Sequence, residues 1–175
     1  QKKFLKGVNI GVGKPGAFPG EYAITKAEYL RWFQNISDMN AEVIRVYTIQ
    51  KPEFYDALHE FNRTAKKPLY LLHGVYMREE LIRRLEDVHS NHSQIKQEFI
   101  ADAQELVDVL HGNAKLPEQP GRASGEYKSD VSEYVIGWIL GIEWDPMFVI
   151  RTNKRNSAQN NYGGKFLYTE KASPF

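Results

Sequence analysis

Apolar residues in this chain of 175 residues gather into four short runs, and the segments between the runs show helical periodicity. The runs are rich in β-branched and aromatic side chains and are bounded by turn-forming residues, which is typical of buried strands. They cover residues 4–10, 43–48, 69–76 and 135–142. Strands that alternate with helices in this way predict an α/β fold with a parallel sheet.

The first two helices have recognisable start signals. Thr25 is followed three residues later by Glu28, which predicts a capping box, and apolar side chains then recur at helical spacing to about residue 40. Pro52 suits the first turn of a second helix, which should end before Pro68. Each helix lies between two predicted strands, as a βαβ unit requires.

The rest of the chain continues this alternation. Two further helices are predicted near residues 78–87 and 93–110, and the stretch 112–128, rich in Gly and Pro, is predicted to be a loop. Residues 144–175 are mostly polar and end in a sequence typical of a helix start. These units make about half of an eight-stranded (β/α)8 TIM barrel, which usually needs roughly 250 residues. We therefore expect residues 1–175 to form the N-terminal half of such a barrel within a larger protein.

Composition narrows the classes of partner. Hydrophobic residues make up 42% of the chain, which indicates a globular protein. Lys plus Arg (23) nearly balance Asp plus Glu (22) and the basic residues are scattered, so nucleic acid is not an expected partner. The chain has no cysteine, and His89 and His92 have no evident third ligand, so no metal site is expected.

Residues 11–16 read GVGKPG and follow a predicted strand, which fits the glycine pattern of dinucleotide-binding loops. However, Pro15 and Pro19 prolong the loop where such a site needs a helix to begin at once. The second strand also lacks the terminal acid that would bind a ribose. We therefore expect no nucleotide cofactor, and no other cofactor is indicated.

Polar side chains occur near the carboxyl ends of the four predicted strands. Because side chains alternate across a strand, one polar residue on each strand is expected to face the inside of the barrel. These residues are Asn9, Arg45, His73 and Glu143. Ligands bind at this end of parallel barrels, so we expect the four side chains to converge on one cleft. Glu143 is the first candidate for a catalytic residue, because a carboxylate beside a buried strand is costly unless it is paired or used.

Each of these residues also has a purely structural interpretation. Arg45 and Glu143 would form an ion pair inside the barrel. His73 would be a hydrogen-bonded histidine of the core, and Asn9 would cap a turn.

Aromatic residues near the same strand ends suggest a sugar-binding cleft. Tyr47, Tyr76 and Trp144 would surround the acid with apolar ring faces, although ordinary packing at the barrel mouth predicts the same residues. Asp145 is a candidate second acid, but an Asp before Pro146 also commonly begins a turn.

Four segments together resemble a known superfamily. They are FLKGVNIG, VIRVYTI, KPLYLLHGVY and YVIGWILGIEWDP, in this order. They resemble the first four strands of the retaining glycoside hydrolases with a TIM-barrel catalytic domain, which include the β-glycosidases of family 2 and the fungal β-1,3-glucanosyltransferases. The resemblance implies a β-linked polysaccharide or oligosaccharide substrate and an extracellular or membrane-associated protein.

The resemblance also implies roles for individual residues. Glu143 would be the general acid/base, and Arg45 would order the catalytic carboxylates. The nucleophile would come from a seventh strand, which this chain does not supply, so an isolated half-barrel should be inactive. Ile142 stands where the superfamily usually has an Asn that binds the sugar 2-hydroxyl. This departure favours the alternative of a non-catalytic carbohydrate-binding or scaffold domain derived from such a barrel.

A half-barrel also has consequences for assembly. It would leave two open sheet edges and an exposed apolar face. The expected partners are therefore the carbohydrate, the remaining half of the barrel, and a second copy of the chain through self-association.

Overall fold

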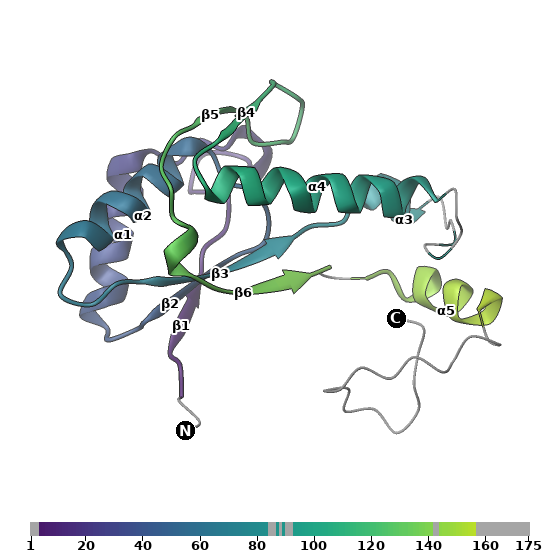
Figure 1. Cartoon of the computed structure of the whole chain (residues 1–175), viewed down its shortest axis with the longest axis horizontal. Helices are drawn as coiled ribbons and strands as arrows, with labels where there is room; N and C mark the ends of the chain where they lie inside the picture. The colour runs from purple at the N-terminus through teal and green to yellow at the C-terminus, as the bar shows by residue number, and fades with distance from the viewer. Residues whose placement is uncertain (1–3, 84–86, 88, 90–92, 142–143, 157–175) are drawn as a thin grey trace. The chain divides into compact units, whose positions relative to one another are not determined.

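The computed structural model describes residues 4–83, 87, 89, 93–141 and 144–156 (Figure 1). The chain divides into two compact units. The first is built from the described residues of Gln1–Tyr76 and Asp102–Leu140, and the second from those of Met77–Ala101 and Gly141–Phe175. Within the described ranges, no helix has the length and apolar character needed to cross a bilayer.

The first unit contains a four-stranded parallel sheet in the order β1-β2-β3-β6. The strands are β1 (Gly7–Asn9), β2 (Val43–Val46), β3 (Tyr70–Val75) and β6 (Val135–Leu140). All four apolar runs thus form strands, each shorter than its run. Helices α1 (Lys26–Asp38) and α2 (Pro52–Thr64) connect the first three strands. The predicted α/β class with a parallel sheet is confirmed.

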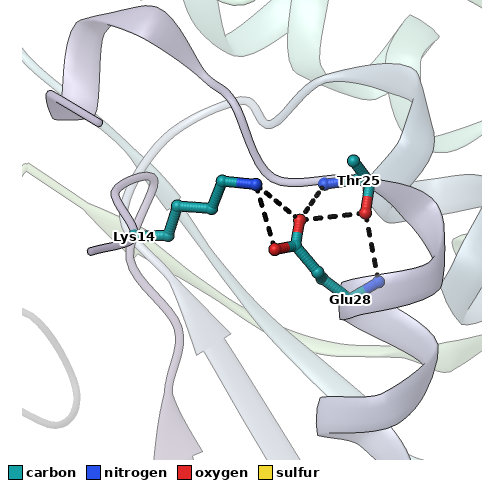
Figure 2. Close-up of polar contacts among 3 residues, drawn as sticks. All are labelled: Lys14, Thr25 and Glu28. Atoms are coloured by element: carbon teal, nitrogen blue, oxygen red, sulfur yellow. Dashed lines mark hydrogen bonds and ion pairs between the residues drawn. The ribbon is translucent and has the colours of Figure 1, made fainter. Parts of the chain in front are cut away.

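The capping box predicted at the start of α1 is present (Figure 2). The Thr25 hydroxyl oxygen accepts from the Glu28 backbone N–H at 3.3 Å, and the Glu28 carboxylate accepts from the Thr25 backbone N–H at 2.8 Å. Lys14 reaches across from the loop after β1 and donates to both Glu28 oxygens, at 2.8 and 3.0 Å. One carboxylate therefore joins the long β1–α1 loop to the first turn of the helix.

An aromatic core joins α1 to α2, which lie side by side in Figure 1. Tyr29 and Phe33 of α1 make edge-to-face contacts with Phe54 of α2 at centroid distances of 5.3 and 5.7 Å. Phe33 also contacts Phe61 at 6.0 Å. Such ring pairs add about 0.5–1.5 kcal/mol each to the burial of their apolar area. The helical faces read from the sequence therefore pack against each other.

The prediction of a loop over residues 112–128 is wrong in part. This stretch contains the short antiparallel strands β4 (Ala114–Leu116) and β5 (Gly125–Tyr127). Gly125 has φ +134° and lies directly against the ring of Pro52, where a Cβ atom would approach the ring within 2.8 Å. Strands of three residues are too short to show an alternating pattern, which explains why the sequence did not reveal them.

The first unit also contains the last part of α4 (Gln94–Leu110) and two short 3₁₀ helices. The 3₁₀ helices are η1 (Pro19–Glu21) in the β1–α1 loop and η2 (Ser132–Tyr134) just before β6.

The second unit is helical and has its own small core. It contains α3 (Glu79–Arg83), the first part of α4 (Gln94–Leu110) and α5 (Pro146–Arg155). Its core residues are Met77, Leu81, Ile82, Ile95 and Phe148, with Phe99 and Trp144 packed against them. The sequence did not predict α5, because its apolar residues all lie in its first half and only Phe148 and Thr152 are buried. The helix start expected at the end of the chain lies outside the described residues.

The cap of α1 can be tested by removing its hydroxyl. Thr25→Ala should lower the free energy of unfolding by about 1 kcal/mol, because one backbone N–H of the first turn loses its acceptor. Urea denaturation followed by circular dichroism measures this change. Thr64→Ala is the control. Thr64 is the last residue of α2, and its hydroxyl donates to the Phe61 carbonyl and caps no N–H group, so its loss should have the smaller effect. Equal effects of the two substitutions would contradict the assignment.

The Lys14–Glu28 contact can be tested by titration. Hydrogen bonds from Lys14, and then from Thr25, lower the pKa of Glu28 from 4.5 to about 2. The stabilisation from this group is therefore complete above about pH 4.5 and is lost as the pH falls toward about 2. In Lys14→Met the pKa of Glu28 should rise toward its ordinary value, whereas Lys14→Arg should keep it low. Carboxyl NMR titration gives the result, and an unchanged pKa in Lys14→Met would refute this cause.

Candidate functional site

One face of the sheet carries two of the predicted polar residues. Asn9 pairs with Arg45, and Arg45 pairs with Leu72, so their side chains share a face. Ile44 and Val46, which alternate with Arg45, are fully buried and mark the opposite face, against the helices. Asn9 is exposed and Arg45 is half-buried. The structure therefore brings Asn9 and Arg45 together near the carboxyl ends of β1 and β2, as expected.

The Arg45 guanidinium is held by weak contacts. Its Cζ atom lies 4.5 Å from the centroid of the Tyr47 ring, a cation–π geometry, so Tyr47 belongs to the same site. Its Nη1 donates to Asn9 Oδ1 at 3.5 Å, the outer limit of a hydrogen bond. Its Nε is buried and has no hydrogen-bond acceptor among the described residues. A buried donor without an acceptor costs about 1–3 kcal/mol, which an oxygen placed against Nε would recover.

His73 does not join this group, which corrects the expected convergence of four side chains. It pairs with Val46 and therefore faces the helices, on the side opposite Arg45. As expected, it shares its face with Leu69 and Leu71, but all three are almost completely buried beneath the helical layer. β3 is apolar on both faces, so its sequence gave no sign of which face was covered. The alternative interpretation, a hydrogen-bonded core histidine, is confirmed.

The contacts of His73 determine its tautomer. Its Nδ1 lies 2.9 Å from the Gly74 carbonyl oxygen, which can only accept, so Nδ1 carries the proton. Its Nε2 lies 3.0 Å from the Tyr55 hydroxyl and must accept from it. Burial lowers the pKa of His73 from 6.5 to about 4, so the ring is neutral near pH 7. Burial also raises the pKa of Tyr55 well above its ordinary value.

Gln50, a residue that the sequence did not single out, organises the polar groups around Tyr55. It is completely buried in the loop between β2 and α2. Its backbone N–H donates to the Tyr55 hydroxyl at 3.1 Å, and its carbonyl accepts from the Tyr127 hydroxyl at 2.9 Å. Its side-chain Nε2 donates to the Thr48 carbonyl at 2.8 Å, and its Oε1 lies 3.4 Å from the Tyr29 hydroxyl. These contacts fix the loop that directly follows Arg45 and Tyr47.

Tyr76, Trp144 and Asp145 are the other predicted site residues that the structure describes, and the contacts given for Trp144 and Asp145 are ones of packing and helix capping. Tyr76 is half-buried just after β3. In the second unit, Trp144 stacks on Phe148 at 5.7 Å with an interplanar angle of 4°, which is a packing contact. Asp145 is the N-cap of α5, and its Oδ1 accepts from the backbone N–H groups of Met147 and Phe148 at 2.8 and 3.1 Å. Asp145 therefore begins a helix, where the sequence suggested either a second acid or the start of a turn.

Three residues named from the sequence lie outside the described residues. They are Glu143, Ile142 and His92. The catalytic role of Glu143 stays a prediction. Among the residues that the structure does describe, no three His, Asp or Glu side chains are grouped closely enough to hold a metal ion.

Comparison with known protein families, with curated proteins and with solved structures finds no match to this chain.

The buried histidine should make stability depend on pH. The unfolded chain takes up a proton near pH 6.5 and the folded chain only near pH 4, so stability is complete above about 6.5 and falls as the pH drops to about 4. The loss from this group is on the order of 3 kcal/mol. Urea denaturation midpoints measured from pH 7.5 to 4 give the slope. His73→Gln should flatten that slope, whereas His89→Gln at an exposed position should not.

This result is independent of any general loss of stability in His73→Gln, because the slope and not the absolute midpoint is compared. A slope that is the same in both variants and in the wild type would show that His73 does not titrate as described.

Proposed function

We propose that this chain forms the first four βα units of a TIM-barrel glycoside hydrolase domain that acts on β-linked polysaccharide or oligosaccharide. The support from the fold is general. The four strands of the main sheet run parallel and lie side by side in chain order, which is the arrangement from which a (β/α)8 barrel is built. The support from sequence is the resemblance of the four strand segments to that superfamily.

The observation that carries the proposal is the buried Nε donor of Arg45, which has no acceptor among the described residues. The guanidinium lies on the face away from the helices, at the carboxyl end of β2. A carboxylate placed there would accept a charge-assisted hydrogen bond, which is about twice as strong as a neutral one. Arg45 thus suits the role that the resemblance gives it, which is to order a catalytic carboxylate.

The proposed chemistry divides its steps among a few groups. Glu143 donates a proton to the leaving oxygen, and a second carboxylate, from a further strand of the barrel, attacks the anomeric carbon. The two carboxyl groups of a retaining site stand about 5–5.5 Å apart. Asn9 and Tyr47 offer an amide and a phenol on the same face as Arg45, and both can bind sugar hydroxyl groups.

A carbohydrate-binding domain without catalysis is the second candidate. It is favoured by the positions of His73 and Asp145, because the first is used in the core and the second caps α5. Neither group is free to act on a substrate. In this alternative Arg45, Asn9 and Tyr47 bind the sugar and no bond is cleaved.

Sugar binding by this face can be tested with the chain itself. Titration of the ¹⁵N-labelled chain with β-linked gluco-oligosaccharides should shift the amide signals of Asn9, Arg45 and Tyr47. Arg45→Lys should weaken binding roughly tenfold, because a lysine cannot keep the planar contact with Tyr47 or the directed Nε donor. Arg31→Lys, an exposed position on α1, is the matched control and should bind like the wild type. Binding that is equally strong in both variants would exclude Arg45 from the site.

Catalysis is tested in the full-length protein. Glu143→Gln should reduce the turnover of β-glucans by at least a hundredfold while leaving oligosaccharide binding in place, because general acid–base catalysis contributes about 10²–10⁴-fold. Unchanged turnover would remove Glu143 from the mechanism. Binding without turnover in the wild-type protein would favour the non-catalytic alternative.

A further inference from the structure

We propose that two copies of this chain pair through opposite edges of their sheets, β6 of each copy against β1 of the other, and close a ring of eight parallel strands. The inference concerns the assembly of residues 1–175 by themselves and does not depend on sugar binding. Where a longer chain supplies the remaining strands of the barrel, those strands would pair with the same two edges. All the residues that carry it belong to the first unit.

The first argument is the open edges. Among the described residues, β1 and β6 each have one strand neighbour and are the two edges of the sheet. An edge strand presents unpaired N–H and C=O groups that readily pair with another chain. All four strands run in the same direction, so β6 of one copy placed beside β1 of the next continues the same parallel ladder.

The second argument is an apolar row on β6. Ile136, Trp138 and Leu140 alternate along the strand and are 42%, 43% and 65% exposed. Trp138 pairs with His73, so its side chain lies on the helical side of the sheet. In β2 and β3 the corresponding residues, Val46 and His73, are completely covered. Within the described part of the first unit, the helical side of β6 therefore has the character of an interior layer that is left exposed.

The third argument is a groove beside the other edge. It has a volume of about 340 Å³, and it is lined by residues of β1, of the loop that follows it and of α1. Val8 pairs with Ile44, so it lies on the helical side of β1, the same layer as Trp138 on β6. Trp32 and Ile36 of α1 also line the groove, and Gly11 leaves open space there. A β6 strand paired with β1 would direct its apolar row into this groove.

Charge at the strand ends agrees with this pairing. Lys6 directly precedes β1 and Glu133 precedes β6 by two residues, and both are exposed. Parallel pairing brings the amino ends of two strands together, so Lys6 of one copy would lie near Glu133 of the other. Antiparallel pairing of β6 with β6 would instead bring the amino end of each strand to the carboxyl end of its partner.

The count of strands explains why two copies suffice. A junction between two different edges repeats indefinitely unless the ring closes. Eight parallel strands form a closed barrel whose interior is just filled by side chains. Two sheets of four strands reach this number, and the faces that carry Arg45 would then line the interior.

The molecular mass in solution gives the first test. Light scattering with size-exclusion chromatography should find twice the 20.2 kDa of one chain. Trp138→Lys places a charge on the β6 edge and should yield the monomer. Val107→Lys is the matched control, because Val107 is 42% exposed on α4, and it should remain a dimer. Circular dichroism verifies that both variants are folded.

The outcomes of this test are decisive in either direction. A wild-type monomer at 100 µM, or a series of larger assemblies in place of a dimer, would overturn the closed two-copy ring. A dimer that persists in Trp138→Lys would exclude the β6 edge from the contact.

Cysteine cross-linking gives the second test, and the absence of native cysteines makes it clean. Within one copy β1 and β6 are separated by two strands, or about 14 Å at the usual strand spacing, which no disulfide can bridge. Val8→Cys combined in turn with Ile136→Cys, Trp138→Cys or Leu140→Cys should therefore give a covalent dimer for at least one pair. Each single variant should stay a monomer on a non-reducing gel.

Cross-linking by Trp138→Cys alone would show that β6 pairs with β6, which contradicts the proposal. Failure of all three pairs to cross-link would also reject it, even if the chain were dimeric.

Discussion

The first unit depends on the buried hydrogen bonds around Gln50. This residue lies in the loop between β2 and α2, and its backbone and side chain contact three tyrosines from α1, α2 and β5. Buried polar groups are tolerated only when they are paired, so these elements can pack in few other arrangements. Tyr55 extends the same set of bonds to His73 on β3. A single loop residue thereby sets the relative positions of two strands, two helices and the β4–β5 hairpin.

This constraint bears directly on the face of the sheet opposite the helices. Arg45 and Tyr47 come just before the fixed loop, so the contacts of Gln50 hold the end of β2. A rigid loop of this kind holds the backbone that carries Arg45, so the donors of the guanidinium are not needed to keep it in place. The covered face thus provides stability, and the opposite face keeps the polar groups that can meet a ligand.

The sequence predicted the elements better than it predicted their surroundings. The four strands, the capping box at Thr25 and the start of α2 at Pro52 depend on residues close together in the chain, so local patterns reveal them. The face of His73 depends on which side of β3 the helices cover, and that is decided by distant residues. The contacts of Gln50 join positions up to 77 residues apart, and no spacing within the chain indicates them. The shared face of Asn9 and Arg45 was therefore predicted correctly, and the face of His73 incorrectly.

The contact between Lys14 and Glu28 affects whether the glycine-rich loop after β1 can bind a phosphate, as its sequence pattern suggests. Loops of this kind bind phosphate by combining a lysine with the positive end of a helix. Here the carboxylate of Glu28 already binds the lysine and the helix start, since it accepts from Lys14 and from the Thr25 backbone N–H (Figure 2). The chain carries its own anion at that position. A phosphate group could enter only by displacing this carboxylate and separating the loop from the helix that it holds.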